Sequence, residues 1–205
     1  MENVLTVAAR NSVFGAFGKV SIKLIGFLFT ILIVRWLGDE GYGQYTLIWS
    51  YVVVISMLSD AGLSLYAIRE IAKKQTDSQY IICNVMVIRV LLALTSMSLI
   101  TGIVWLLDYS EQFVLHVFLA SNVLWLYAIQ EPLDGVLQAN ERFDFSVAAI
   151  IGGLLVFIGA GVILLWIGWH VTAVIAARLL NVLVSILLVW RLLANYRSDL
   201  QWRIQ

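Results

Sequence analysis

Four basic side chains interrupt stretches of sequence that are otherwise apolar, namely Lys19, Lys23, Arg89 and Arg178. A charge at the centre of a bilayer costs at least about 2.5 kcal/mol, so such residues normally face a bundle interior or a water-filled cavity. Ammonium and guanidinium groups supply both positive charge and N–H donors to phosphate oxygens. The four residues therefore predict a cationic cavity that holds an anion, such as a phosphate-bearing molecule.

Polar residues near these cations are candidates for supporting roles. Asn181 follows Arg178 by three residues, which places both on one helical face, and Asn84 precedes Arg89 in the same half of its apolar stretch. Asp60 stands near the end of another apolar stretch, next to a glycine turn. We expect Asp60 to make a structural contact, by capping backbone N–H groups or by pairing with a nearby cation.

Each basic residue also has a simpler interpretation. Lys19, and less easily Lys23, could extend along the helix to the lipid headgroups. Arg89 and Arg178 could each form a structural ion pair, with Asp60 or Glu131 as the partner. Because four cations face only two carboxylates within the apolar stretches, a positive excess remains, and we favour the cavity.

The composition indicates which class of protein must position these residues. Of the 205 residues, 61% are hydrophobic and 13% are charged, whereas a soluble domain has about 25% charged residues. We therefore expect an all-α integral membrane protein. The net charge of zero argues against a nucleic-acid partner. The single cysteine, Cys83, excludes an internal disulfide and a cysteine-based zinc site.

Six apolar stretches are each long enough to cross a hydrocarbon core that needs about 20 helical residues. They form a six-helix bundle over residues 1–194, followed by a tail or linker at 195–205, and polar joints separate most of them. Gly168, Trp169 and His170 leave so short a turn between the last two that these must pair antiparallel. The expected spans are residues 12–34, 45–66, 80–107, 113–133, 147–169 and 171–194.

The basic residues of the joints predict the orientation. If the six spans alternate, eight of these residues fall on one side of the membrane and only Arg35 falls on the other. Lys and Arg are enriched in cytoplasmic loops. We therefore expect a multi-pass protein of the cytoplasmic membrane with both termini in the cytoplasm.

Motifs of enzyme active sites are absent from the sequence, including HExxH, GxSxG and the phosphate-binding GxxxxGK[ST] loop. His116 and His170 fall near the outer face, where we interpret them as interfacial polar residues. The acidic joint that contains Glu131, Asp134, Glu141 and Asp144 could suggest a metal site, but we favour a solvated loop. We expect no enzyme activity, no metal and no cofactor, and leave open a coupling to H⁺ or Na⁺.

Residues 31–74 resemble the beginning of the lipid-linked oligosaccharide flippases of the multidrug/oligosaccharidyl-lipid/polysaccharide (MOP) exporter superfamily. In that family the first helix ends in an arginine before an LGPEGYG-like turn, and here Arg35 precedes LGDEGYG, with Asp39 where proline is common. The family's D-x-G-L and R-E-I-A elements match residues 60–63 and 69–72. GVLQANERF at 135–143 is a weaker match to the joint after the family's fourth helix.

The resemblance implies one six-helix lobe of a two-lobed transporter. Such a transporter moves an oligosaccharide on a polyprenyl diphosphate across the cytoplasmic membrane by alternating access, with membrane lipids and a second lobe as partners. Lys19, Lys23 and Arg89 correspond by helix and depth to the family's cavity cations, whereas Arg178 rests on its own sequence context. Family members are longer, so we expect this chain to be an N-terminal half. The alternatives are a MOP-type exporter of another small molecule, or a six-helix scaffold or enzyme that acts on polyprenyl phosphates.

Overall fold

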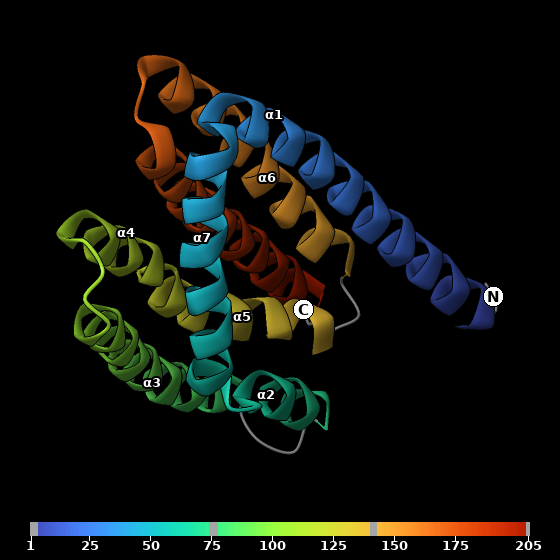
Figure 1. Ribbon diagram of the computed structural model, residues 1–205. Helices are drawn as coiled ribbons and strands as arrows, with labels where there is room; N and C mark the ends of the chain where they lie inside the picture. The colour runs from blue at the N-terminus through green and yellow to red at the C-terminus, as the bar shows by residue number, and fades with distance from the viewer. Residues whose placement is uncertain (1–3, 74–77, 140–142, 204–205) are drawn as a thin grey trace.

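A computed structural model describes residues 4–73, 78–139 and 143–203, and this part of the chain is helical apart from short turns (Figure 1). The all-α prediction is therefore confirmed for the described chain. The helices are α1 (Val4–Asp60), α2 (Leu63–Ala72), α3 (Ser78–Leu106), α4 (Glu111–Ser121), α5 (Val123–Ala139), α6 (Phe143–Ile167) and α7 (His170–Arg203).

The long helix α1 changes direction at Gly38, whose backbone is non-helical, with φ 68° and ψ 179°. The positive φ is a conformation that glycine adopts without the steric cost of a Cβ atom. Figure 1 shows the first part of α1 running obliquely and the second part, drawn in cyan, crossing the bundle. The joint at 37–43 was expected to be a turn, but it contains a single kink, and Asp39–Gly43 continue as helix.

Two residues in the left-handed region separate α1 from α2. Ala61 has φ 45° and Gly62 has φ 79°, and the helix axes on either side meet at 46°. The bend brings the carboxylate at the end of α1 beside the first turn of α2. This geometry places Asp60 within hydrogen-bonding distance of Ser64 in α2.

α4 and α5 together form the fourth long apolar segment, Glu111–Gln138, interrupted only near Asn122. Ser110 caps the N-terminus of α4, because its hydroxyl accepts a hydrogen bond from the N–H of Phe113 at 3.4 Å. We expected this segment to end at Leu133, but α5 continues to Ala139. Residues such as Asp134 therefore lie on a helix rather than in a solvated loop.

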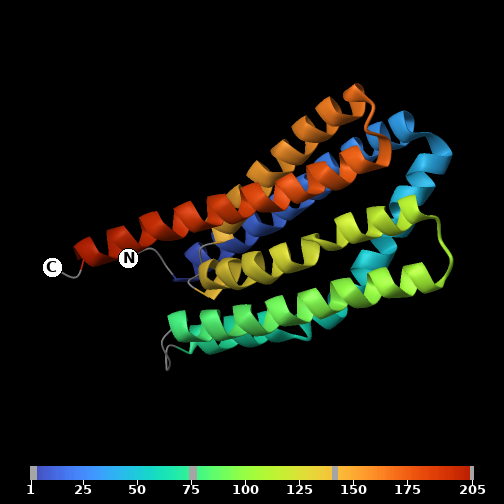
Figure 2. The same ribbon diagram turned by 90° about the vertical axis from the view of Figure 1, so that its left-hand side faces the viewer.

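α6 and α7 form the antiparallel pair that their short joint predicted, with Gly168 at φ 95° in the turn (Figure 2). Small residues on α6 allow this pair to pack closely. A Cβ atom at Gly152 would lie 2.5 Å from Leu188, and one at Gly153 would overlap the Ser185 hydroxyl and lie 2.9 Å from the backbone oxygen of Asn181. The backbones of α6 and α7 therefore approach closely at these glycines.

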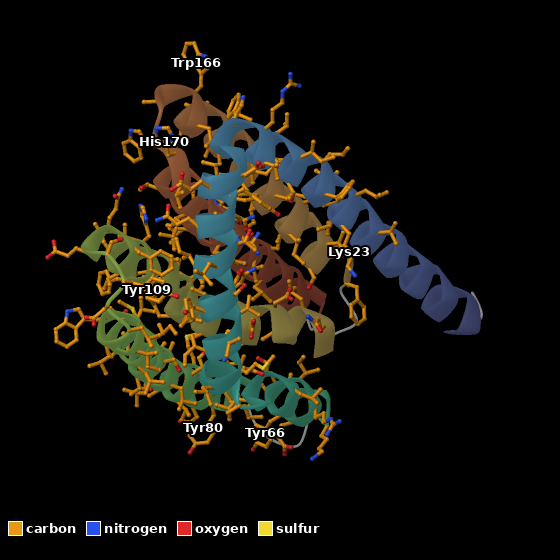
Figure 3. The ribbon with its side chains drawn as sticks, viewed as in Figure 1. Lys23, Tyr66, Tyr80, Tyr109, Trp166 and His170 are labelled. Carbon is orange, nitrogen blue, oxygen red and sulfur yellow. The ribbon has the colours of Figure 1, made fainter. Side chains whose placement is uncertain are left out.

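The bundle exposes large apolar side chains around its outside. Val54, Met57 and Trp166 are 67%, 72% and 84% exposed, although each would favour an apolar environment. A soluble monomer rarely shows so much contiguous apolar surface. Trp166 lies near the α6–α7 turn, whereas Tyr66 and Tyr80 lie at the α2–α3 end (Figure 3). Aromatic residues at both ends are typical of membrane interfaces.

Within the described residues, four helices are long and apolar enough to cross a membrane, and a fifth span is added if the bent α1–α2 pair is counted as one. The α1 helix contains the first predicted span and most of the second, joined at the Gly38 kink, and the end of the second span falls in the bend and in α2. The prediction of six spans remains a prediction. The start of α1 and the end of α7 lie at the same end of the bundle (Figure 2), as an even number of crossings requires.

Candidate functional site around two intramembrane arginines

Arg178 of α7 lies between aromatic rings from two other helices. Its guanidinium carbon is 5.3 Å from the centre of the Trp49 ring on α1 and 5.5 Å from that of Phe157 on α6. These distances fall within the range of cation–π attraction, which contributes up to about 2 kcal/mol when the pair is desolvated. The apolar clusters on both sides fix the rings, because Phe157 also packs edge-on against Phe29 with centroids 4.9 Å apart.

The guanidinium of Arg178 has few polar partners. One terminal N–H group donates to the hydroxyl of Tyr127 on α5 at 3.4 Å, and the buried Nε atom has no partner. No carboxylate in the described chain forms an ion pair with it. An arginine has five N–H donors and remains charged. With respect to the described part of the chain, Arg178 therefore keeps an uncompensated positive charge and free donors.

Arg89 of α3 has the opposite environment. Its side chain is 2% exposed, and its Nη2 atom lies 2.5 Å from Glu131 of α5 and 3.4 Å from Asp60 of α1. Its Nη1 atom donates to the hydroxyl of Ser64 on α2 at 2.8 Å. We name these four residues the Arg89 cluster.

The bend between α1 and α2 explains how the Arg89 cluster forms. Asp60 ends α1, and its Oδ1 accepts hydrogen bonds from the backbone N–H of Ser64 at 3.2 Å and from the Ser64 hydroxyl at 2.6 Å. The carboxylate thus satisfies an N–H group in the first turn of α2 that has no intrahelical partner. This confirms that Asp60 makes a structural contact.

α5 carries a polar stripe that links the two arginines. Tyr127, Glu131, Asp134 and Gln138 lie at helical spacing, so their side chains share one face. Tyr127 contacts Arg178, and Glu131, one turn later, contacts Arg89. Asp134 accepts from Gln138 at 2.8 Å and from Ser146 of α6.

Pro132 lies inside α5 and directly follows Glu131, a member of the polar stripe. It lacks a backbone N–H, so it cannot donate to the carbonyl of Ala128. Proline inside a helix also disfavours straight geometry. The helix therefore lacks one backbone hydrogen bond at Pro132. This position lies after Tyr127 and Glu131, which contact the two arginines, and before Asp134.

The structure separates the predicted site residues into different environments. Arg89 forms the ion pair with Asp60 and Glu131 that was the alternative to a cavity role, so its charge is already neutralised. Lys23 is exposed on α1 (Figure 3), and the side chain of Lys19 lies outside the part of the chain described. Asn84 is exposed on α3. Asn181 is half-buried against α6 beside Gly153.

Several contact residues were not predicted from the sequence. The partners missed were Ser64 on α2, and Trp49 and Tyr127 around Arg178. The polar spacing of residues 127–138 was a signal for the stripe of α5, but its acidic residues were interpreted as a solvated loop. Among the residues that the structure describes, no group of three or more His, Cys, Asp or Glu side chains could hold a metal ion. Glu141 of the suggested metal cluster lies outside them.

Comparisons with known proteins give one family. The model of the family described as polysaccharide biosynthesis protein matches residues 8–201, which is nearly the whole chain. No curated protein and no solved structure gives a significant match.

Proposed function

We propose that this chain, which belongs to the polysaccharide biosynthesis protein family, forms the N-terminal lobe of a MOP-type transporter. The transporter flips an oligosaccharide linked to a polyprenyl diphosphate across the cytoplasmic membrane. The family match and the helices that are apolar enough to span a bilayer support a multi-pass membrane transporter. The observation that carries the choice of an anionic substrate is the uncompensated guanidinium of Arg178.

Arg178 is suited to a diphosphate because its charge has no carboxylate partner in the described chain and most of its N–H donors are free. Trp49 and Phe157 hold the planar group between them, so its edge is left for a ligand. Guanidinium groups bind phosphate oxygens in a bidentate manner. We assign to Arg178 the principal contact with the diphosphate.

The two lysines have an auxiliary role in this proposal. Lys23 is exposed on α1, and Lys19 precedes it by one turn in the sequence. Both add positive potential along the path of the substrate, which attracts an anion over a longer range than a direct contact does. Arg89 acts indirectly, because Asp60 and Glu131 neutralise its charge and it holds α1, α2, α3 and α5 together.

Transport requires more than this bundle. We propose that a second lobe of similar architecture faces the lobe described here and that the two alternate in their opening to either side, with both ends of this chain in the cytoplasm. The lobes work in contact with membrane lipid and use no metal or enzymatic step. An ion gradient of H⁺ or Na⁺ supplies the driving force.

Two other functions compete with this one. A MOP-type exporter of cationic drugs is disfavoured, because an uncompensated arginine would repel a cationic ligand. A six-helix scaffold or an enzyme that acts on polyprenyl phosphates would also accommodate Arg178. These alternatives predict no transbilayer movement of the glycan, so transport distinguishes them.

Complementation of a strain that lacks its own flippase tests the proposal. The full-length protein should restore export of the surface glycan, Arg178→Lys should restore part of it, and Arg178→Gln should not restore it at equal membrane abundance. Arg191→Gln is the matched control, because Arg191 is an exposed arginine on the same helix. Normal export by Arg178→Gln would refute the role of this residue, and failure of the unaltered protein to restore any export would refute the transport function.

A further inference from the structure

A groove runs along the surface between α3 and α4. It consists of two adjoining cavities of about 390 Å³ and about 380 Å³, which share the lining residues Thr101, Trp105, Val114 and Phe118. Small-molecule sites begin at about 300 Å³, so each cavity alone is of sufficient size. Because the two cavities share these side chains, one elongated ligand can occupy both.

The inner cavity, toward the middle of the helices, is apolar. Met97 and Gly102 of α3 line it, together with side chains of α4. Its two hydroxyl groups, those of Ser98 and Thr101, each donate to a backbone carbonyl of α3, at 3.0 Å and 2.8 Å. Residues 97–105 extend over about 12 Å of the helix, at about 1.5 Å per residue. This part of the groove therefore matches a hydrocarbon chain that lies parallel to α3.

The outer cavity, at the turn between α3 and α4, is acidic. Asp108 has φ 54° in this turn and Glu111 lies in the first turn of α4, and both line the cavity. Neither carboxylate forms an ion pair within the described residues, and none of the residues that line the cavity is basic. Both acids are exposed, so a cationic ligand can reach them.

Two aromatic rings lie beside these carboxylates. The Tyr109 ring stacks on Phe113 with centroids 4.6 Å apart, and its hydroxyl lies 3.2 Å from that of Tyr51 on α1, so its position is fixed without a ligand (Figure 3). Trp105 is 68% exposed on α3. The faces of such rings attract cations within about 6 Å. Carboxylates combined with aromatic faces are suited to an ammonium group, because both attract it.

A metal ion fits the outer cavity less well. Ca²⁺ takes about 6–8 oxygen ligands, whereas only Asp108 and Glu111 supply carboxylates here. Among the described residues, no group of three or more His, Cys, Asp or Glu side chains could hold a metal. The adjoining apolar cavity would also have no role in binding an ion. An amphipathic ligand uses both the acidic end and the apolar length of the groove.

The position of the groove in the bundle suits a lipid. The α3–α4 turn, the α6–α7 turn and the bend within α1 lie at the same end of the bundle, opposite to the two termini (Figure 2). Exposed tryptophan residues such as Trp105 and Trp166 are typical of the level of the headgroups. The acidic end of the groove therefore lies level with the headgroups, and its apolar part lies level with the acyl chains.

We propose that the groove binds one phospholipid with a primary ammonium headgroup, such as phosphatidylethanolamine. The ammonium group donates to the carboxylates of Asp108 and Glu111 and lies against the two aromatic rings. One acyl chain fills the inner cavity beside Gly102. A primary ammonium has three N–H donors, whereas the quaternary ammonium of phosphatidylcholine has none. With both termini in the cytoplasm, as proposed, the lipid comes from the outer leaflet.

Native mass spectrometry of the full-length protein in detergent measures the binding of single lipids. Dioleoyl phosphatidylethanolamine should bind at least about tenfold more tightly than dioleoyl phosphatidylglycerol, because hydrogen bonds to charged groups commonly contribute that much. Dioleoyl phosphatidylcholine should bind with intermediate affinity, since it keeps the cation but lacks the N–H donors. Asp108→Asn combined with Glu111→Gln should abolish the preference. Asp39→Asn combined with Glu40→Gln is the matched control and should retain it, because these acids are exposed beside the kink of α1 and do not line the groove.

A second variant tests the acyl chain. A Cβ atom at Gly102 would have nothing within 4 Å, so Gly102→Leu should fill the inner cavity without a clash and leave Tm unchanged. It should weaken the binding of phosphatidylethanolamine about tenfold, because the acyl chain loses the apolar surface of the cavity. Gly159→Leu is the matched control, because Gly159 lies on α6 and its Cβ atom would also have nothing within 4 Å.

Each arm of the test can refute part of the proposal. Equal affinity of the unaltered protein for phosphatidylethanolamine and phosphatidylglycerol, or a preference that persists when both acids are replaced, would overturn the headgroup site. Unchanged binding by Gly102→Leu would overturn the insertion of an acyl chain. Displacement of the lipid by Ca²⁺ would assign the two acids to a metal ion instead. None of these measurements requires transport of a glycan, so the lipid site and the proposed function can fail separately.

Discussion

Replacement of Arg89 with glutamine should destabilise the bundle more than any other single change in the polar interior. The guanidinium is 2% exposed and contacts residues of α1, α2 and α5. Removal of one partner from a buried ion pair typically costs about 3–5 kcal/mol, because the other charges remain buried without compensation. Asp60 and Glu131 are 36% and 44% exposed, so solvent relieves part of this cost. We therefore expect the lower end of that range, about 3 kcal/mol.

The corresponding loss of thermal stability can be measured on the purified full-length protein. For a lobe of this size, each kcal/mol lowers Tm by about 2–4 °C, so the unfolding transition of this lobe in Arg89→Gln should lie about 6–12 °C below that in the unaltered protein. Tryptophan fluorescence during heating in detergent follows the transition. Arg178→Gln is the control, because Arg178 has no carboxylate partner in the described chain, and its replacement removes cation–π attraction of about 1–2 kcal/mol and one long hydrogen bond to Tyr127. Equal Tm values for Arg89→Gln and the unaltered protein would show that the ion pairs do not support the fold.

Three further changes test the packing, the topology and the path of the substrate. Gly153→Ala should lower Tm because its Cβ atom would overlap the Ser185 hydroxyl and lie 2.9 Å from the backbone oxygen of Asn181. Gly159→Ala, whose Cβ atom would have nothing within 4 Å, should not lower it, and equal Tm values would contradict the close α6–α7 contact. Single cysteines at positions Ser110 and Ser198 should react with impermeant maleimide from opposite sides of the membrane, and labelling from the same side would refute the six-span count. Lys23→Ala should reduce glycan export several-fold, whereas Lys23→Arg should retain the export of the unaltered protein. Export by Lys23→Ala at the level of the unaltered protein would show that Lys23 only contacts lipid headgroups.

Much of the architecture follows from hydropathy, because long apolar segments can satisfy their backbone groups in lipid only as helices. This argument predicted the helical class, and the short joint between the last two spans predicted the antiparallel α6–α7 pair. It failed at residues 37–43, where several glycines and acidic residues suggested a turn. The change of direction occurs at Gly38, whose backbone is non-helical, and the residues that follow it continue in helical conformation.

The site was harder to predict because its charges belong to different helices. Sequence spacing shows which residues share a face of one helix, but it does not show which faces meet. Arg89 was therefore assigned to the cavity, although Asp60 and Glu131 had been recognised as the acids that could neutralise it. Arg178 had no motif in its support, and its uncompensated charge emerges only when Trp49, Phe157 and Tyr127 are seen around it.

Reconstituted transport tests the central claim most directly. The full-length protein is placed in vesicles with a fluorescent oligosaccharide on a polyprenyl diphosphate, and an impermeant reagent quenches the label in the outer leaflet. We expect labelled lipid to move between leaflets with the unaltered protein and with Arg191→Gln, and to move at the rate of protein-free vesicles with Arg178→Gln. No movement with the unaltered protein, or equal movement with Arg178→Gln, would contradict the proposal that this lobe binds the diphosphate through Arg178.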